Sequence, residues 1–258
     1  MNIVALYKIF RGREFLEASI ASVYNHVDKI VFVSSNIGWD GKDGNNTEAV
    51  ARAYPDPLKK IVVLKHDTTD QEAQYRIGQQ FVMAHYKPDW VLLIDSDEVW
   101  TEMAWERAME YLFNAPADVQ AFTCNMHTYI KDVLYMVDDT YGTQVKPTIF
   151  TRPMCICQGI RGNGADPRRF MAGVTVHHFA LVRDDIDEVF RKMTTSRVGD
   201  RYAPPLVHLE TWQAEVWDKI PGPAYHYYVG CAGVWQKTIE VDRDLLPYSV
   251  RNWRPANG

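Results

Sequence analysis

The chain has 258 residues, of which 47% are hydrophobic and 24% charged, and its formal net charge is −5. This length and composition allow one large α/β domain with a sizeable core. The net negative charge is unlike the strongly basic charge of nucleic-acid-binding proteins, so no nucleic-acid partner is expected.

The sequence as a whole also predicts a soluble, cytoplasmic protein. The N-terminal stretch MNIVALYKIF has too short an apolar run for a signal peptide. No segment approaches the roughly 20 apolar residues of a membrane helix, so no transmembrane segment is expected. The four cysteines form no C-x-x-C pair, which predicts reduced thiols rather than a disulfide scaffold.

Strands and helices alternate along the first 115 residues. Short apolar runs predict strands at 2–7, 29–34, 61–65 and 90–94. Apolar residues at helical spacing and turn signals predict helices at 14–24, 47–54, 69–86 and 101–114. Thr69-Asp70-Gln71-Glu72 is a capping-box signature, and Thr101 is positioned to cap the last helix. This alternation predicts a parallel sheet with right-handed crossovers.

The pattern changes after residue 115. Strands without intervening helices are predicted at 120–125, 128–137, 146–151 and 173–182, followed by a helix that Asp184 or Asp185 caps and that reaches about Ser196. The expected fold is therefore α/β, a Rossmann-like mixed sheet flanked by helices, with a C-terminal helical or irregular extension. We expect three parts, at 1–115, 116–183 and 184–258, the first two forming one domain and the third an extension or lid.

The segment WVLLIDSDEVW, from Trp90 to Trp100, is the most informative in the chain. Its apolar run predicts a buried parallel strand, and ligands bind beyond the carboxyl ends of such strands. Asp95 and Asp97 would point to the same side of an extended chain, which predicts a hard-oxygen site for Mg²⁺ or Mn²⁺. The alternative is a solvated turn in which the acidic residues only favour the start of the next helix.

Residues 2–113 resemble the nucleotide-sugar-dependent glycosyltransferases of the GT-A fold, family 2 type. The resemblance rests on the strands NIVALYK and IVFVS, on Tyr75-Arg76-Ile77-Gly78, and on Asp95-Ser96-Asp97, which matches the D-x-D motif of that family. It implies a metal-dependent glycosyltransferase that uses a UDP- or GDP-sugar as donor. The hydroxyl acceptor would belong to a glycan, a lipid carrier or a protein.

The resemblance also implies roles for single residues. Asp97 would ligate the metal directly, while Asp95 would contact the metal or the ribose, with Ser96 between them in the donor site. Arg76 would contact the donor nucleotide. Tyr7 would stack on the base and Lys8 would meet a phosphate. Each of these residues has an ordinary structural alternative, such as a solvated surface position for Arg76.

One departure from the family concerns the end of the second strand. The family commonly has an acidic residue there that reads the base or ribose, whereas this chain has Ser34-Ser35-Asn36. Asn36 would then supply neutral hydrogen bonds, or Asp40 would substitute from the following loop. Gly78 is a second unusual position, because a glycine inside a helix costs roughly 1 kcal/mol and indicates close approach by a neighbour or ligand.

Two adjacent histidines, His177 and His178, lie in a predicted late strand. Neighbouring strand residues point to opposite faces, so one histidine at most faces a site. Several GT-A enzymes place a histidine on a late strand as a further metal ligand, and the resemblance favours His178, with His177 as the second choice. The alternative is one buried, hydrogen-bonded histidine and one exposed histidine.

The catalytic base is the least determined residue. An inverting transfer, which the family resemblance favours over a retaining one, requires a carboxylate that takes the proton of the acceptor hydroxyl. Asp138, Asp139 and Asp166 lie in polar or glycine-rich loops of the second half. Asp166 is preferred because its glycine-rich loop precedes the histidine strand, although each is also a plausible loop residue.

Two other functions fit parts of the pattern. Sugar-phosphate nucleotidylyltransferases bind metal on a similar sheet, but their glycine-rich loop after the first strand is reduced here to a single glycine, Gly12. A non-catalytic module that binds nucleotide or glycan is the second alternative. A dehydrogenase is disfavoured because no G-x-G-x-x-G follows the first strand. Aromatic residues after 184, including Trp212 and Trp217, would either stack on sugars or pack a helical cap.

Overall fold

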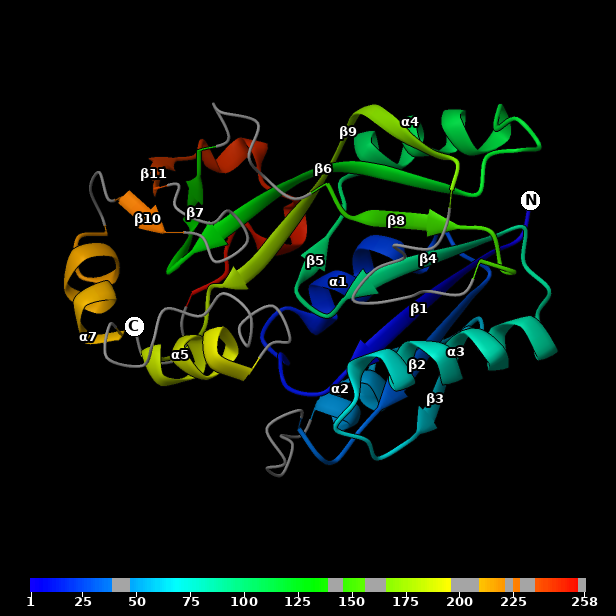
Figure 1. Ribbon diagram of the computed structural model, residues 1–258, viewed down its shortest axis with the longest axis horizontal. Helices are drawn as coiled ribbons and strands as arrows, with labels where there is room; N and C mark the ends of the chain where they lie inside the picture. Colours follow the sequence, from blue (N-terminus) through cyan, green and yellow to red (C-terminus); the bar gives the residue numbers. More distant parts are fainter. Residues whose placement is uncertain are drawn as a thin grey trace. The chain divides into compact units, whose positions relative to one another are not determined.

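The computed structural model describes residues 1–38, 47–138, 146–155, 166–195, 209–220, 225–227 and 235–254. These residues form two compact units, each of which is described by itself (Figure 1). Unit 1 comprises Met1–Asn125 and Lys146–Val176, and unit 2 comprises Met126–Val145 and His177–Gly258. The division at residues 115 and 183 that the sequence indicates stays a prediction.

Unit 1 contains the predicted alternation of strands and helices. Its elements are β1 (Ile3–Ile9), α1 (Leu16–Tyr24), β2 (Lys29–Ser34), α2 (Thr47–Ala53), β3 (Ile61–Lys65), α3 (Gln71–His85), β4 (Trp90–Asp95), β5 (Glu98–Val99), α4 (Glu102–Phe113) and β8 (Thr148–Thr151). It also holds the first parts of β6 (Ala121–Ile130) and of β9 (Arg168–Leu181).

The sheet of unit 1 is mixed, as the sequence predicts. Its strands follow the order β6, β8, β4, β1, β2, β3. The pairs β4–β1, β1–β2 and β2–β3 are parallel, whereas β8 runs antiparallel to both β4 and β6. The prediction of an α/β fold with a parallel core flanked by helices is confirmed.

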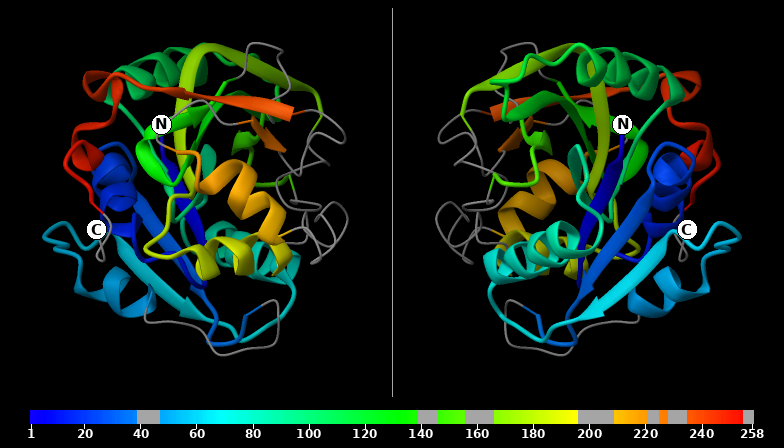
Figure 2. Two further views of the ribbon diagram at one scale, coloured as in Figure 1. Left: turned by 90° about the vertical axis from the view of Figure 1, so that its left-hand side faces the viewer. Right: turned by 90° about the vertical axis from the view of Figure 1, so that its right-hand side faces the viewer.

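Alternation along the strands separates two apolar layers. Ile3, Ala5 and Tyr7 of β1 pack with residues of α1, α2 and α4, whereas Val4 and Leu6 pack with α3. Figure 2 shows α1 and α2 on one side of these strands and α3 on the other. Both faces are covered, which explains why β1, β2 and β4 are continuous apolar runs instead of alternating ones.

Gly78 has a packing role in α3. A Cβ atom at this position would lie 2.4 Å from Cδ1 of Leu6 and 2.8 Å from Cγ2 of Val33. Only glycine lets the helix approach β1 and β2 this closely. Of the two explanations for Gly78, close approach by a neighbour is therefore sufficient.

Helix starts follow the predicted caps with one difference. The Thr101 hydroxyl accepts a hydrogen bond from Ala104 N at 3.1 Å at the start of α4. In α3 the capping residue is Asp70, whose carboxylate accepts from Glu72 N at 2.8 Å, so the helix begins one residue later than a cap at Thr69 would place it. The Thr68 hydroxyl instead accepts from Asp70 N at 3.0 Å, which fixes the entry into the helix.

Unit 2 contains an antiparallel sheet and a small helical cluster. The second part of β6 pairs with β7 (Asp132–Val137), β7 pairs with β11 (Trp235–Glu240), and β11 pairs with β10 (Tyr225–Tyr227). The helical elements are α5 (Ile186–Thr195), α7 (Leu209–Trp212), the π-helical segment η2 (Gln213–Trp217), and the 3₁₀ turns η3 (Arg243–Leu245) and η4 (Tyr248–Val250). The long predicted strand at 128–137 is in fact the end of β6, a turn at Lys131, and β7.

Trp212 and Trp217 of unit 2 pack in a helical cap. Trp212 is buried against Phe190 and Trp217, with ring centroids 5.9 Å and 6.2 Å apart. Lys131 donates hydrogen bonds of 2.7 Å to the carbonyl oxygens of Trp217 and Ile220 and thereby caps the end of this segment. Of the two uses considered for Trp212 and Trp217, the packing role is the one present.

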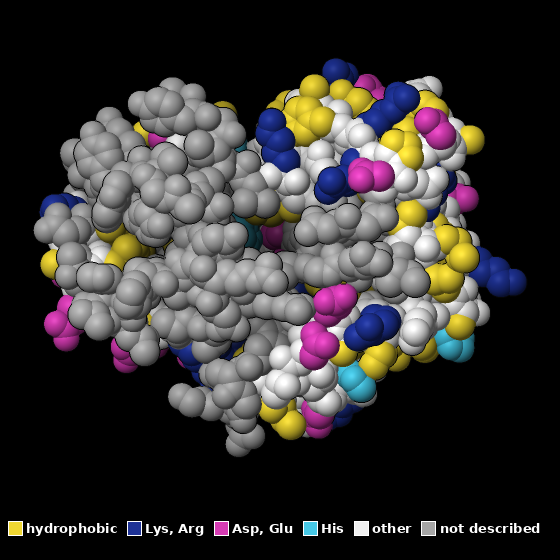
Figure 3. Space-filling view, in the orientation of Figure 1, with side chains coloured by type: hydrophobic (Ala, Val, Ile, Leu, Met, Phe, Trp, Pro, Cys, Tyr) yellow, Lys and Arg dark blue, Asp and Glu magenta, His cyan; other side chains and the backbone are white. Residues whose placement is uncertain are grey.

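Among the described residues, no helix combines the length and apolar composition that spanning a bilayer requires. On the face shown in Figure 3, the basic side chains of the described residues are interspersed with acidic ones.

Candidate functional site

The parallel strands of unit 1 contain a topological switch point. From β1 the chain moves through α1 to β2 and through α2 to β3, with both helices packed on one face. It then crosses through α3, on the opposite face, to β4 on the other side of β1. The direction of strand addition thus reverses between β1 and β4, and ligands of open α/β sheets bind at the carboxyl ends of the two strands that flank such a point.

Charged side chains occupy this position. Lys8 of β1 and Asp95 of β4 are cross-strand neighbours, and Lys8 Nζ lies 2.6 Å from Asp95 Oδ1. The Tyr75 hydroxyl of α3 donates to the same oxygen at 3.4 Å, and Lys8 Nζ lies 5.2 Å from the centre of the Tyr75 ring. The Lys8 side chain is only 6% exposed, whereas that of Asp95 is 23% exposed.

Strand alternation explains this grouping. Lys8 continues the row of Val4 and Leu6, and Asp95 continues the row of Val91 and Leu93, on the face that α3 covers. Tyr75 is the buried residue of α3 that meets both rows. Three polar side chains from separate segments therefore meet because each lies on the same face of the sheet or on the helix packed there.

The rest of the acidic motif forms a turn. β4 ends at Asp95, and residues Ser96 and Asp97 turn before β5 begins at Glu98. The expectation that strand alternation directs Asp95 and Asp97 to one side therefore does not apply beyond Asp95. The Glu98 carboxylate accepts from Asp95 N at 3.2 Å and so closes the turn.

This turn is tightly packed. Ser96, Asp97 and Glu98 are 7%, 3% and 1% exposed. Gly12, in the loop after β1, has φ of +114° and lies so close that a Cβ atom there would be 2.8 Å from Ser96 Oγ. The single glycine of that loop thus both adopts a left-handed backbone and makes room for the motif.

The oxygen-rich turn fits the ligand chemistry of a hard divalent cation. Within the part of the chain that the structure describes, no group of three or more His, Cys, Asp or Glu side chains is arranged to hold a metal ion. Mg²⁺ and similar ions are commonly held by only one or two carboxylates, with phosphate and water oxygens completing the shell. The roles of Asp95 and Asp97 as metal ligands stay predictions.

Tyr7 lies elsewhere than predicted. Its side chain is fully buried, packs on Phe32 with ring centroids 4.7 Å apart, and shares a 3.0 Å hydrogen bond with Ser19 of α1. Burial is the main cause of the strongly raised pKa of Tyr7. Because Tyr7 and Lys8 point to opposite faces, the ring is part of the α1 core, and this arrangement does not support stacking on a base.

Asn36 forms a polar corner with a residue that sequence reasoning missed. Asp67, which follows β3, accepts from Asn36 N at 2.8 Å and from Asn36 Nδ2 at 3.3 Å. The buried Ser35 hydroxyl stabilises the corner by donating to Ile37 O at 2.8 Å. Asp67 was recognisable as a carboxylate after the third strand, since parallel strands bring their carboxyl ends to one edge. Asp40 lies outside the described residues.

A second carboxylate fills the end of β2. Glu48 of α2 accepts from the Ser34 hydroxyl and from Arg52 Nε, both at 2.8 Å. Burial alone would raise the pKa of Glu48, but these two hydrogen bonds outweigh it and lower that pKa. Acidic groups thus stand near the end of β2 although β2 itself ends in Ser34.

Two other predicted residues of unit 1, Arg76 and Asp166, are exposed. Arg76 is exposed on α3 and makes no hydrogen bond or ion pair with any described residue. Asp166 pairs with Arg168 at 3.1 Å, and the next residue, Pro167, accepts from Gln120 N where β6 begins. In register, that end of β6 lies beside Thr151 and Val91, at the start of β4. The structure therefore does not bring Asp166 together with Asp95, and its assignment as base stays a prediction.

The histidines belong to unit 2. His177 is 7% exposed and its Nδ1 shares a 2.8 Å hydrogen bond with the hydroxyl of Tyr129. Burial, with a contribution from His127, lowers the pKa of His177 to about 3, so this ring is neutral at neutral pH. His178 is less buried. His177 thus matches the buried, hydrogen-bonded alternative, and His178 stays the predicted metal ligand.

Two candidate bases also belong to unit 2. Asp138 is half-buried directly after β7. Asp139 lies outside the described residues. Both assignments stay predictions.

Comparison with known proteins gives structural matches only. No protein-family model matches the chain, and no curated protein matches it. S. aureus TarS 1-349 in complex with UDP is similar, with 12% identity and a TM-score of 0.48, over 81% of this chain and 69% of that chain. Another structure of S. aureus TarS is similar with 11% identity and a TM-score of 0.49, over 81% of this chain and 42% of that chain.

A further match is glucosyl-3-phosphoglycerate synthase from Mycobacterium tuberculosis, in complex with Mn²⁺, UDP and phosphoglyceric acid. Its identity is 14% and its TM-score 0.44, over 75% of this chain and 78% of that chain. The chain is thus structurally similar to GT-A glycosyltransferases at low identity. At this level of similarity the activity has to follow from the site itself.

Proposed function

We propose that the protein is a metal-dependent glycosyltransferase. It would transfer a sugar from a nucleoside-diphosphate sugar, with UDP or GDP as the leaving group, to a hydroxyl group of a glycan, a lipid carrier or a protein. The transfer would invert the anomeric centre. The observation that carries the proposal is the charged pair Lys8–Asp95 at the carboxyl ends of the two strands that flank the switch point.

The edge of the sheet offers different chemistry at its two ends. Lys8 and Asp95 lie at the carboxyl ends of β1 and β4, and Asp97 follows β4, so charge predominates there. The Asn36–Asp67 corner lies after β2 and β3. Neighbouring strands are about 4.8 Å apart, so the corner is on the order of 10 Å from β4. We assign the diphosphate to the charged end and the nucleoside to the corner, where Asp67 accepts hydrogen bonds from base or ribose.

The residues of the charged end would act together on the leaving group. Asp97 would hold a Mn²⁺ or Mg²⁺ ion, and Asp95 would contact either the ribose or the metal, directly or through water. The ion would stabilise the negative charge that develops as the diphosphate leaves. Lys8 and Tyr75 both contact Asp95 Oδ1 and hold the carboxylate in one orientation before the donor arrives. Ser96 and Arg76 remain proposed donor contacts.

The acceptor side rests on predictions from the sequence. A carboxylate must take the proton of the attacking hydroxyl. Asp166, Asp138 and Asp139 remain the proposed candidates, and His178 the proposed additional metal ligand.

A thermal-shift screen tests donor binding. A ligand that binds only the folded chain raises the melting temperature. UDP or GDP should raise the melting temperature more with Mn²⁺ than without it. The corresponding nucleoside monophosphate should raise it less than the diphosphate does. A chain that no nucleoside diphosphate stabilises, with or without Mn²⁺, contradicts the proposal.

A second assay separates an enzyme from a binding module. Glycosyltransferases commonly hydrolyse their donor slowly when no acceptor is present, because water replaces the acceptor hydroxyl. Release of UDP or GDP from the matching sugar nucleotides, lost in Asp97→Asn, would support catalysis. Tight binding with no release from any donor would indicate a non-catalytic nucleotide-binding module.

A further inference from the structure

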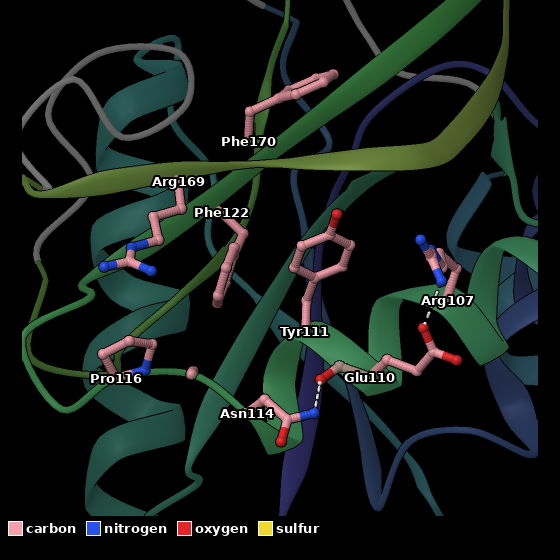
Figure 4. A pocket seen from close by; sticks show the side chains of 9 residues that line it. Arg107, Glu110, Tyr111, Asn114, Pro116, Phe122, Arg169 and Phe170 are labelled. Carbon is pink, nitrogen blue, oxygen red and sulfur yellow. Dashed lines mark hydrogen bonds and ion pairs between the residues drawn. The ribbon is translucent and has the colours of Figure 1, made fainter.

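Unit 1 contains a pocket that the proposed donor site does not use. It has a volume of about 440 Å³ and lies between the C-terminal end of α4 and the start of β9 (Figure 4). We call it the α4–β9 pocket; the residues used below are Arg107, Glu110, Tyr111, Asn114, Phe122 and Arg169. Its volume falls within the range of about 300–1,000 Å³ that is typical of small-molecule sites.

The pocket lies at the opposite end of β4 from the donor site. The ring of Phe122, in its floor, is 5.3 Å from that of Trp90, the first residue of β4. Asp95 is the last residue of the same strand. Five residues of strand span about 16 Å. A ligand of the pocket therefore does not occupy the donor site.

The pocket carries one cation that the fold does not use. Arg107 and Glu110 neutralise each other at 2.7 Å. Arg169 is exposed and forms no hydrogen bond or ion pair with any described residue. Its guanidinium group can offer a fork of donors that matches a carboxylate or phosphate group.

Arg169 does not cap the nearby helix either. The carbonyl oxygen of Glu110 accepts from Asn114 N at 3.2 Å and from Asn114 Nδ2 at 2.8 Å. Ala115 N donates to Leu112 O at 3.4 Å. Carbonyl groups at the end of α4 thus have their own donors, which leaves the guanidinium of Arg169 available to a ligand.

The floor of the pocket is aromatic. The rings of Tyr111 and Phe122 lie with centroids 6.2 Å apart, and the Tyr111 hydroxyl is fixed by hydrogen bonds with the backbone of Ala172 at 3.1 Å and 3.3 Å. The Asn114 side chain adds an amide oxygen that can accept from a hydroxyl group. An aromatic floor with a few polar groups on its rim suits a ring that carries hydroxyls.

We propose that the α4–β9 pocket binds a sugar ring that carries a carboxylate or phosphate group. The anionic group would pair with Arg169, the ring would lie on Tyr111, and a hydroxyl would donate to Asn114. The chain would thereby hold an acidic glycan at a point about 16 Å or more from the donor site. This inference does not depend on the proposed transferase activity.

Ligand-observed NMR of the full chain, without nucleotide, tests the pocket. The probes are glucuronate, glucose 6-phosphate and glucose, titrated into wild type, Arg169→Ala and Arg168→Ala. Both arginines are exposed, so neither variant should unfold, and Arg168 is the matched control because its partner is Asp166. At least one acidic sugar should bind wild type and the Arg168 variant alike, and Arg169→Ala should weaken it by about tenfold, as expected for loss of a charge-assisted hydrogen bond.

Preference for glucuronate over glucose 6-phosphate, or the reverse, would identify the anionic group and support the proposal in either case. Binding of glucose as tight as that of the acidic sugars would overturn it, as would acidic-sugar binding unchanged in Arg169→Ala, or no binding of either acidic sugar. A thermal shift with UDP and Mn²⁺ on the same wild-type sample keeps the two proposals separate. A chain that binds UDP but no acidic sugar contradicts only the pocket.

Discussion

At the scale of single residues, Lys8 and Asp95 form the most constrained polar contact of the candidate site. Lys8 is almost completely buried, and its Nζ atom lies 2.6 Å from a carboxylate oxygen that Tyr75 also contacts. The carboxylate keeps 23% of its side-chain surface exposed. Such a pair fixes the orientation of a carboxylate that is still partly exposed.

Replacing Lys8 by methionine tests this pair. Lys8→Met keeps the buried stem but removes the cation, so Asp95 loses its closest positive partner. Removing one partner of a buried ion pair costs about 3–5 kcal/mol, and the partial exposure of Asp95 should reduce this to about 1–3 kcal/mol. Urea unfolding measures the loss, and nucleotide titration should show weaker binding.

Lys87→Met is the matched control, because Lys87 is exposed just before β4. It should change neither stability nor nucleotide affinity. If Lys8→Met behaved like this control in both measurements, the ion pair would have no role in the site.

Sequence reasoning reached the acidic motif but not its surroundings. The buried run before Asp95 indicated a strand end, and the structure has β4 ending there. It could not show that Tyr7 enters the α1 core while Lys8 faces α3, because only the register of β1 against its neighbours decides which residue points where. Asp67 could have been recognised as a carboxylate that follows the third strand, but its hydrogen bonds with Asn36 depend on the pairing of β2 with β3.

At the scale of elements, α3 packs closely on the face of β1 and β2 beside the proposed donor site. A Cβ atom at Gly78 would lie too close to the side chains of Leu6 and Val33. The helix was predictable from its cap and period, whereas the reason for the glycine needed the packed structure. Close packing at this point holds Tyr75, three residues earlier, against Lys8 and Asp95.

Gly78→Ala should therefore be destabilising although alanine is the better helix former. The propensity gain is about 1 kcal/mol, whereas overpacking typically costs about 1–3 kcal/mol. We expect a net loss of unfolding free energy in urea, together with weaker nucleotide binding as α3 shifts. Gln80→Ala, at an exposed position of α3, serves as control. A variant at position 78 more stable than wild type would contradict this packing.

The segment between α2 and β3 should give the chain an acid-sensitive contact. Asp56 accepts from the Tyr24 hydroxyl at 2.6 Å, Lys60 N at 2.8 Å and Ile61 N at 2.9 Å. Burial alone would raise the pKa of Asp56, but these hydrogen bonds lower it below its ordinary value of 3.8. Stability from this group is thus complete above pH 3.8 and is lost as pH falls through the lower folded pKa.

Urea unfolding between pH 5 and pH 2.5 would reveal this contribution. Wild type should lose more stability over this range than Asp56→Asn, which does not titrate. Asp118→Asn, a surface change, should follow wild type. Parallel curves for wild type and Asp56→Asn would rule out the lowered pKa.

At the scale of the whole molecule, the two units carry different parts of the account. The donor residues and the α4–β9 pocket all belong to unit 1, and the histidines with the tryptophan cluster belong to unit 2. The alternating first half was predictable from local periodicity. The second half was less so, because β11 pairs with β7 across a long sequence separation, with Thr238 beside Val137.

Trp212→Ala tests whether the cluster of unit 2 is structural. Trp212 is 4% exposed, and truncating a buried tryptophan typically costs about 3–5 kcal/mol. The melting temperature should fall markedly, while nucleotide affinity at a temperature where the chain is folded should stay close to that of wild type. A stable variant that specifically lost sugar binding would instead indicate a stacking role.

The most direct test is calorimetric titration of the nucleoside diphosphate preferred in the thermal screen, with and without Mn²⁺. Wild type and Asp118→Asn should both bind it more tightly with Mn²⁺. Asp97→Asn makes the same chemical change in the turn after β4. It should lose the increase in affinity that Mn²⁺ gives, about tenfold or more. Its unfolding temperature should stay near that of wild type. Full Mn²⁺-dependent binding by Asp97→Asn would contradict the assignment of this strand end as the site of the metal and the diphosphate.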